Sequence, residues 1–239
     1  MITRHNRFLS VMTHQALLKG SVLVILLIGS LGITIVWPQH VPPQTNPIFP
    51  ERTSRDEWQK PVEIIEALAL KPGETVADIG SGAGYFTGWL SQAVSAKGKV
   101  YAVDINTQAI QLLKDKLPFY PIKNIEPVLC TESDLKLPPQ SLDVAFLLNT
   151  FSVVSQKETM LQNVMTALKP HGRLTIIDWR ENLDGPPGPP RAQRLSERAV
   201  LEMAKAAGFK LDRRSEMLPS QYFLEFSKNS NRPNLARKR

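Results

Sequence analysis

From residue 55 to residue 226, short apolar runs alternate with segments in which apolar residues recur every three or four positions. Runs rich in Val, Ile and Leu predict β-strands, whereas the three-to-four spacing predicts amphipathic helices. The predicted strands are 75–78, 98–104, 125–129, 142–148 and 173–178, followed by two more within FKLDRRSEML and QYFLEF. The predicted helices are 55–70, 85–93, 107–117, 158–168 and 197–207. Within the first of these, Pro61 fits either a first helical turn or a break between two short helices.

This alternation of strands and helices predicts an α/β fold with a mostly parallel sheet. The run LDVAFLL (142–148) is apolar throughout, as expected of a strand that is buried on both faces. The last of the seven strands is expected to run antiparallel to the others. We therefore expect a seven-stranded sheet with helices on both faces, and a ligand site beyond the carboxyl end of the first strand.

A long uncharged run lies upstream of this region. The 17 residues from Ser21 to Trp37 carry no charge, and Lys19 precedes them. As a helix the run is about 26 Å long, near the lower limit for crossing a bilayer. The sequence therefore predicts a transmembrane signal-anchor helix at 20–37. A cleaved signal peptide and a buried helix of the globular domain are the alternatives.

The charges around this run predict its orientation in a membrane. Arg4, Arg7 and Lys19 precede it, and the next basic residue is Arg52. Because basic residues stay on the cytoplasmic side, we expect the N-terminus in the cytoplasm and the globular domain on the far side. The chain then divides into a basic N-terminal tail (1–19), the membrane helix (20–37), a Pro-rich linker (38–54), the globular domain (55–226) and a basic, disordered C-terminal tail (227–239).

The net charge of +7 is concentrated at the two ends of the chain. Residues 1–19 and 227–239 hold 8 of the 29 Lys and Arg residues and no acid, which leaves 21 basic against 22 acidic residues between them. A nearly neutral domain is not expected to bind nucleic acid. The basic C-terminal tail fits either a solubilising end or attraction to anionic lipids. The single cysteine and four scattered histidines predict neither a disulfide nor a metal site.

A glycine-rich loop follows the first predicted strand of the domain. The stretch VADIGSGAGYFT (76–87) carries Gly80, Gly82 and Gly84. A dinucleotide-binding loop reads G-x-G-x-x-G, whereas the third glycine here comes one residue early. Asp78 would repel a pyrophosphate but suits an amine or a sulfonium. The loop therefore predicts a nucleoside that carries an amino-acid-like tail.

Four stretches, in this order, resemble the class I S-adenosylmethionine-dependent methyltransferases over residues 55–226. They are RDEWQKP…EALALKPGETVADIGSGAGYFT, GKVYAVDI, LPPQSLDVAFLLN and LKPHGRLTIIDWR. The resemblance implies a Rossmann-like fold, S-adenosyl-L-methionine as the cofactor, and methyl transfer. The pairing of RDEWQKP with PPGPP further resembles a bacterial membrane-anchored or exported branch whose substrate is uncharacterised.

The resemblance implies cofactor contacts at the loop and at the end of the second strand. Gly80, Gly82 and Gly84 would let the backbone approach the amino-acid portion of the cofactor. Asp78 would orient the amine of that portion, and Asp104 would accept hydrogen bonds from both ribose hydroxyls. Charge-assisted hydrogen bonds of this kind contribute roughly 1.5–3 kcal/mol each. Capping the helix that follows is the alternative role for Asp104.

Four further residues are expected around the rest of the cofactor. Ile105 would lie against the adenine, and Glu132 would contact its edge, with Thr131 supplying backbone; a solvated loop acid is the alternative for Glu132. Asn149 ends the fourth strand, where the family lines the methyl-transfer pocket. Asp178 is the candidate catalytic base if the acceptor must lose a proton, and a structural acid is the alternative.

The segment after the fourth strand leaves the methyl acceptor open. Related sequences often carry a Tyr-His-His-like run there, whereas this chain reads NTFSVVS. We expect a membrane-tethered methyltransferase that aligns its donor with a small or lipid-like acceptor. The alternative is a non-catalytic subunit or sensor that binds S-adenosylmethionine or a nucleoside at the membrane. The segment GPPGPP (185–190) fits either a lid or a plain loop.

Overall fold

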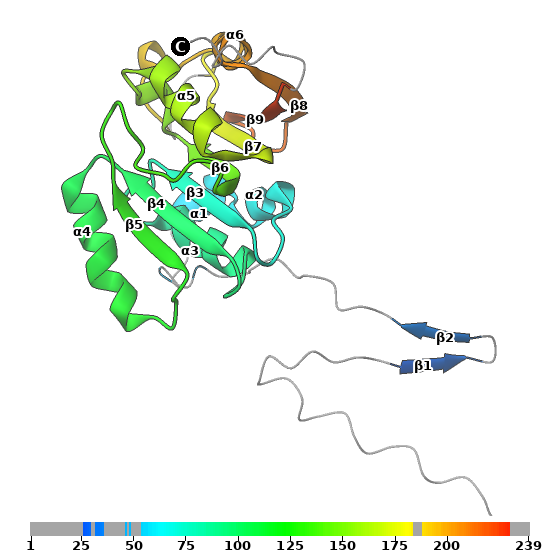
Figure 1. The fold of residues 1–239 in the computed structure, drawn as a ribbon. Coiled ribbons are helices and arrows are strands. Elements are labelled where there is room, and N and C mark those ends of the chain that lie inside the picture. The colour runs from blue at the N-terminus through cyan, green and yellow to red at the C-terminus, as the bar shows by residue number, and fades with distance from the viewer. Residues whose placement is uncertain are drawn as a thin grey trace, which may run out of the picture. The chain divides into compact units, whose positions relative to one another are not determined.

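Figure 1 shows a computed structural model of the chain, which describes residues 54–183 and 188–229, residues 46 and 48, and the backbone of 26–29 and 32–35. The chain forms two units, residues 1–41 and 42–239. All helices in the described part of the chain belong to the second unit.

The second unit is built around a seven-stranded sheet in the order β5-β4-β3-β6-β7-β9-β8. Its strands are β3 Thr75–Ile79, β4 Lys99–Asp104, β5 Ile125–Leu129, β6 Leu142–Leu148, β7 Leu168–Trp179, β8 Phe209–Ser215 and β9 Gln221–Lys228. Neighbouring strands from β5 to β7 are parallel, whereas β9 is antiparallel to both β7 and β8. The predicted mixed sheet with an antiparallel last strand is therefore confirmed.

Helices cover both faces of this sheet. They are α1 Ser54–Gln59, α2 Pro61–Leu68, α3 Tyr85–Ala93, α4 Thr107–Lys116, α5 Lys157–Ala167 and α6 Glu197–Ala207, with short 3-10 helices η1 Leu117–Phe119, η2 Phe151–Val153 and η3 Arg191–Gln193. Val76 packs in a cluster with Ile65 of α2 and Leu90 of α3. The next residue of β3, Ala77, packs in a second cluster with α5 and α6. Because successive side chains of a strand point to opposite faces, the sheet separates these two cores.

Local sequence signals set the helix bounds. Asn106 caps α4 and Ser196 caps α6, since each side-chain oxygen accepts backbone N–H groups of the first turn, and Gly208 ends α6 in a left-handed conformation. The helical region 55–70 is divided at Lys60, whose φ is 49°, so of the two readings of Pro61 the break between two short helices is confirmed. Pro61 explains the break, because a proline disfavours helical geometry in the residue before it.

The first unit has strands where the sequence predicted a helix. β1 (Leu26–Gly29) pairs antiparallel with β2 (Gly32–Ile35), so these eight residues differ from the predicted membrane helix at 20–37. β2 contains three β-branched residues, which favour extended backbone. The remainder of 20–37 lies outside the described residues, as do residues 1–19 and 230–239. None of the described helices has the length and apolar character needed to cross a membrane.

The domain extends beyond the predicted bounds of 55–226 at both ends. Asn46 and Ile48, in the predicted linker, are buried, and Ile48 packs against Ala102 and Leu113. At the other end, β9 continues to Lys228, inside the predicted tail. The remainder of the linker, apart from Ser54 in α1, is outside the described residues.

Candidate functional site

The glycine loop leaves β3 and turns into α3. Gly80, Gly82 and Gly84 all have positive φ angles, of 78°, 54° and 94°. A Cβ atom on Gly80 would lie 2.2 Å from Thr150 Oγ1, and one on Gly84 would lie 2.7 Å from a methyl carbon of Leu113. A Cβ atom on Gly82 would meet nothing within 4 Å. Packing therefore requires glycine at the two outer positions, whereas the middle position leaves open space for a ligand.

Asp104 lies beside this loop at the end of β4. Its Oδ2 accepts a hydrogen bond from the Gly82 backbone N–H at 2.8 Å, and its Oδ1 accepts one from the Asn106 N–H at 2.8 Å. Asn106, not Asp104, caps α4, so the alternative assignment of Asp104 as a helix cap is wrong. The carboxylate is thus held against the middle glycine by two backbone donors.

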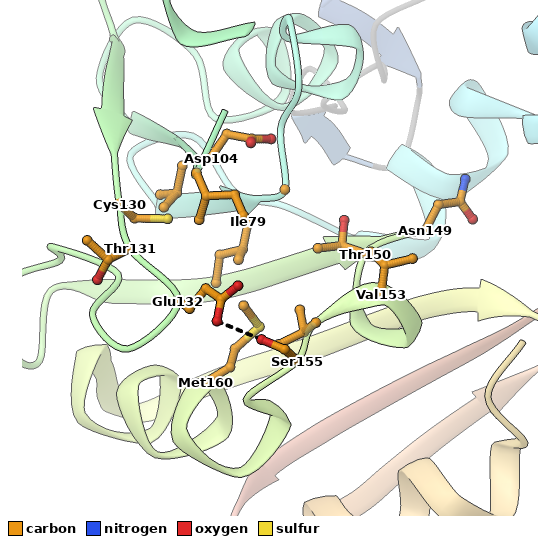
Figure 2. A pocket seen from close by; sticks show the side chains of 14 residues that line it. Ile79, Asp104, Cys130, Thr131, Glu132, Asn149, Thr150, Val153, Ser155 and Met160 are labelled. Atoms are coloured by element: carbon orange, nitrogen blue, oxygen red, sulfur yellow. Dashed lines mark hydrogen bonds between the residues drawn. The ribbon is translucent and has the colours of Figure 1, made fainter. Parts of the chain in front are cut away.

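A cavity of about 290 Å³ opens next to Asp104 and the loop (Figure 2). It is lined by Ile79, Gly80, Val103, Asp104, Ile105, Cys130, Thr131, Glu132, Asn149, Thr150, Val153, Val154, Ser155 and Met160. These residues follow the carboxyl ends of the neighbouring strands β3, β4, β5 and β6, where ligands bind in parallel sheets. Four of the predicted site residues beyond the loop, namely Asp104, Ile105, Glu132 and Asn149, are therefore brought together.

The side of the cavity near β5 combines an acid with apolar groups. Glu132 Oε2 accepts a hydrogen bond from Ser155 Oγ at 2.8 Å, which links the segments after β5 and β6 (Figure 2). Ile105 is 57 % exposed on the same cavity. Burial raises the pKa of the Cys130 thiol to about 11, so this group is neutral at physiological pH. Glu132 is solvent-exposed, and it lies at the cavity, where it bonds to Ser155.

Asp78 lies outside the residues that line the cavity. Its carboxylate is buried, and Oδ2 accepts a hydrogen bond from Thr87 Oγ1 at 2.6 Å. Burial raises the pKa of Asp78 to about 7, against the opposing effects of the Thr87 hydrogen bond and of Arg55. Asp78 therefore supports the start of α3 and is poised between its neutral and charged forms near neutral pH.

Asn149 belongs to a closed ring of three side-chain amides. Its Nδ2 donates to Gln59 Oε1 at 2.9 Å, Gln59 Nε2 donates to Gln221 Oε1 at 2.8 Å, and Gln221 Nε2 donates to Asn149 Oδ1. The Asn149 amide accordingly points away from the cavity (Figure 2), and its backbone is left-handed with φ of 56°. The ring ties α1 to the end of β6 and the start of β9, and of its three residues only Asn149 lines the cavity.

Asp178, the predicted catalytic base, is not among the residues that line the cavity. It is buried, and its carboxylate accepts hydrogen bonds from the Ser152 N–H at 2.8 Å, the Ser152 hydroxyl at 3.1 Å and the Trp179 N–H at 2.9 Å. Burial raises the pKa of Asp178, while these hydrogen bonds lower it. The carboxylate therefore anchors η2, which leads into the Val153–Ser155 part of the cavity wall.

The sequence analysis singled out the segment after β6 for handling the acceptor, but it named no residue of that segment beyond Asn149 as a wall of the cavity. Thr150, Val153, Val154, Ser155 and Met160 all line it. Their position directly after the carboxyl end of a central parallel strand was an available signal. Their chemical types gave no signal, because small polar and apolar residues are equally common in loops and cores.

The comparisons with known proteins agree with this geometry. A family model described as a methyltransferase domain matches residues 76–172, from β3 into β7. A solved S-adenosylmethionine-dependent methyltransferase from Aquifex aeolicus is 31% identical, with a TM-score of 0.70. That alignment covers 73% of this chain and 93% of the Aquifex chain.

Two further matches extend the comparison. The ubiquinone/menaquinone biosynthesis C-methyltransferase UbiE of Vibrio vulnificus is 29% identical over 123 residues, which are 51% of this chain and 47% of UbiE. The chain thus spans about half the length of the curated relatives it matches. A methyltransferase structure from Mesorhizobium loti, 15% identical with a TM-score of 0.56 over 69% of this chain and 95% of its own, shares the fold.

Proposed function

Because the chain belongs to the S-adenosylmethionine-dependent methyltransferases, we propose that it transfers a methyl group from S-adenosyl-L-methionine to a small or lipid-like acceptor. The observation that carries this proposal is the pairing of Gly82 with Asp104 beside the cavity. Gly82 leaves room for a ligand, and the Asp104 carboxylate is fixed next to that room.

The residues present suit the parts of this cofactor. Asp104 offers a carboxylate for the ribose hydroxyls, and Glu132 offers another for the polar edge of the adenine. Ile79, Val103 and Met160 supply an apolar lining for the flat ring. Asp78 is buried beside the loop, where it bonds to Thr87 of α3, and its charged form would attract the positively charged amine.

The chain's own residues contribute alignment more than proton transfer. When bound, S-adenosylmethionine supplies an electrophilic methyl group on a positively charged sulfur. Among the described residues that line the cavity, Asp104 is held by two backbone N–H groups, Glu132 is bonded to Ser155, and the Cys130 thiol is neutral. We therefore expect an acceptor atom that is nucleophilic without help from a protein base, and a rate that depends on positioning.

The rim of the cavity favours an apolar acceptor. Ile105 is 57 % exposed and Val153 is 68 % exposed, and both line the cavity. Exposed apolar side chains at a cavity mouth are typical of sites that bind apolar ligands. The UbiE relatives are named for ubiquinone and menaquinone biosynthesis, which supports a lipid-like acceptor here.

Calorimetric titration of the full chain with S-adenosylmethionine tests the proposal. We expect binding by the wild type and at least about tenfold weaker binding by Asp104→Ala, since charge-assisted hydrogen bonds to the ribose are lost. Asp115→Ala, which removes an exposed acid of α4, is the matched control and should bind as the wild type does. A wild-type protein that does not bind S-adenosylmethionine would refute the proposal.

A second candidate function is cofactor binding without turnover. It is favoured by the segment NTFSVVS after β6, which lacks the histidines that related sequences often carry there. Incubation with S-adenosylmethionine labelled in its methyl group, followed by extraction of lipids and small molecules, distinguishes the two functions. Label in an extract supports the enzyme, whereas binding with no transfer to any extract supports the sensor or subunit.

We also propose that the uncharged run 21–37 attaches the protein to a membrane, with the basic N-terminal tail in the cytoplasm and the globular domain on the far side. The absence of charge over 17 residues and the basic residues before the run support this proposal. A reporter fused to the C-terminus that is active only outside the cytoplasm should then be active. Activity of a cytosol-only reporter at the same position would contradict it.

A further inference from the structure

Arg55 in α1 is a cation without a hydrogen-bonding partner in the described part of the chain. Its Nε atom is buried and makes no hydrogen bond, and no ion pair to its guanidinium is present among the described residues. The guanidinium lies 3.9 Å from the ring centre of Tyr85 and 5.9 Å from that of Trp58. Two aromatic rings thus fix its position while its hydrogen-bond donors remain available.

The position of Arg55 is set by the two ends of α1. At the start of the helix, the neighbouring Asp56 accepts a hydrogen bond from the Tyr85 hydroxyl, and Tyr85 is the first residue of α3 after the glycine loop. At the end of the helix, Gln59 bonds to Asn149, which lines the cavity. The helix therefore runs alongside the glycine loop toward the end of β6, and Arg55 lies at its glycine-loop end.

The charges around the loop create a need for such a cation. An amino-acid tail carries an amine and a carboxylate, and the acids that flank the loop, Asp78 and Asp104, would attract the amine and repel the carboxylate. Arg55 is close enough to Asp78 for each to influence the ionisation of the other. A planar guanidinium held on an aromatic face suits a carboxylate, because it can donate two parallel hydrogen bonds.

We propose that Arg55 binds the carboxylate of the methyl donor's amino-acid tail. This inference rests on the proposed function and adds a subsite to it: Asp104 recognises the nucleoside, and Arg55 recognises the acidic end of the tail. Arg55 thereby distinguishes the complete donor from nucleosides that lack an amino acid.

Two ligands that differ in this tail test the inference in calorimetric titrations of the full chain. S-adenosylhomocysteine carries the amino-acid tail, and 5′-methylthioadenosine lacks it. We expect Arg55→Gln to weaken binding of S-adenosylhomocysteine by roughly 10- to 100-fold, the loss expected for charge-assisted hydrogen bonds. Binding of 5′-methylthioadenosine should change by less than about threefold, since that ligand does not reach Arg55.

Two further variants separate recognition from structural support. Arg198→Gln removes an exposed arginine of α6 that pairs with Glu202, and it should leave the binding of both ligands unchanged. Arg55→Lys keeps the charge but loses the planar fork of donors, so it should bind S-adenosylhomocysteine more weakly than the wild type does and should leave 5′-methylthioadenosine binding unchanged.

The outcomes separate this inference from the function on which it rests. An equal loss for both ligands in Arg55→Gln, no loss for either, or wild-type binding of S-adenosylhomocysteine by Arg55→Lys would overturn the Arg55 assignment while leaving the methyltransferase proposal intact. A wild-type protein that binds neither ligand would overturn both.

Discussion

Asp78 is an acid whose surroundings oppose its charge. Burial raises its pKa from about 4 in an unfolded chain to about 7 in the folded protein. Between these two values the unfolded chain has lost the proton and the folded protein retains it. The folded state therefore binds more protons, so the free energy of unfolding falls as the pH rises through this window.

Replacing Asp78 with a residue that does not ionise should remove its contribution to the pH dependence of the free energy of unfolding. We expect Asp78→Asn to gain stability relative to the wild type between pH 4 and pH 8 by about 2–4 kcal/mol. Urea unfolding of both proteins at several pH values measures the difference. Asp115→Asn, at an exposed acid of α4, should show no comparable trend, and a parallel course of wild type and Asp78→Asn would contradict the assignment.

Single residues differ in how far the sequence predicts them. The spacing in VADIGSGAGYFT predicted a ligand loop, and Asp104 follows from its place at the end of a strand. The engagement of Asp178 with Ser152 could not be predicted, because it depends on how η2 folds back over β7. Arg55 was visible in the sequence as one charged residue among many. That it has no hydrogen-bonding partner among the described residues follows from the packed structure and could not be read from the sequence.

At the scale of elements, the amide ring is one of the contacts that hold α1 against the sheet. Gln59→Ala would leave the Asn149 Nδ2 and the Gln221 Oε1 without their partners in a buried site. We expect a loss of about 1–3 kcal/mol in the free energy of unfolding, since unpaired buried polar groups cost this much. Urea unfolding measures it, and Gln108→Ala, at an exposed glutamine of α4, is the matched control expected to stay within about 0.5 kcal/mol.

Hydrogen exchange of α1 separates the ring from a general loss of stability. If the ring holds α1, its amides should exchange faster in Gln59→Ala than in the wild type, while those of β3 and β6 remain protected. Uniformly faster exchange across the sheet would indicate that the ring supports the whole domain instead of α1.

Most elements followed directly from the periodicity of the sequence. The strands 125–129 and 142–148 were predicted at their observed bounds, because runs of five and seven residues between polar turns have the length of a strand and are shorter than most helices. The strand predicted at 173–178 is longer in the structure, because β7 begins at Leu168 and includes residues 169–172. β1 and β2 were missed because an apolar run by itself does not separate a helix from strands, and the β-branched residues were the remaining signal.

At the scale of the whole molecule, the packed domain begins before the first predicted helix. Ile48 is 2 % exposed, and Asn46 bonds to the backbone carbonyl of Tyr85. A chain lacking residues 1–41 should keep the thermal unfolding midpoint of the domain. In a chain lacking residues 1–53 the free energy of unfolding should fall by about 2–5 kcal/mol and the thermal midpoint should fall with it, because a buried isoleucine and its contacts are removed.

Ile48→Ala in the longer chain checks the cause. This substitution should reproduce a large part of the loss in free energy of unfolding, because it leaves a cavity beside Ala102 and Leu113. Leu112→Ala, at a leucine that is 54 % exposed, serves as the control. Equal midpoints for the two shortened chains would show that residues 42–53 do not support the domain.

The amide ring also has a consequence for the order of synthesis. Gln59 and Gln221 are 162 positions apart, so they are made at well-separated times on the ribosome. The parallel strands β3, β4, β5 and β6 can pair as soon as they emerge, but α1 gains its amide partner from β9 only when nearly all of the domain has been translated. Newly made chains are therefore expected to form the parallel part of the sheet before α1 is fixed beside the ligand site. A chain stalled on the ribosome before β9 emerges would have paired strands but an α1 that lacks its amide partner.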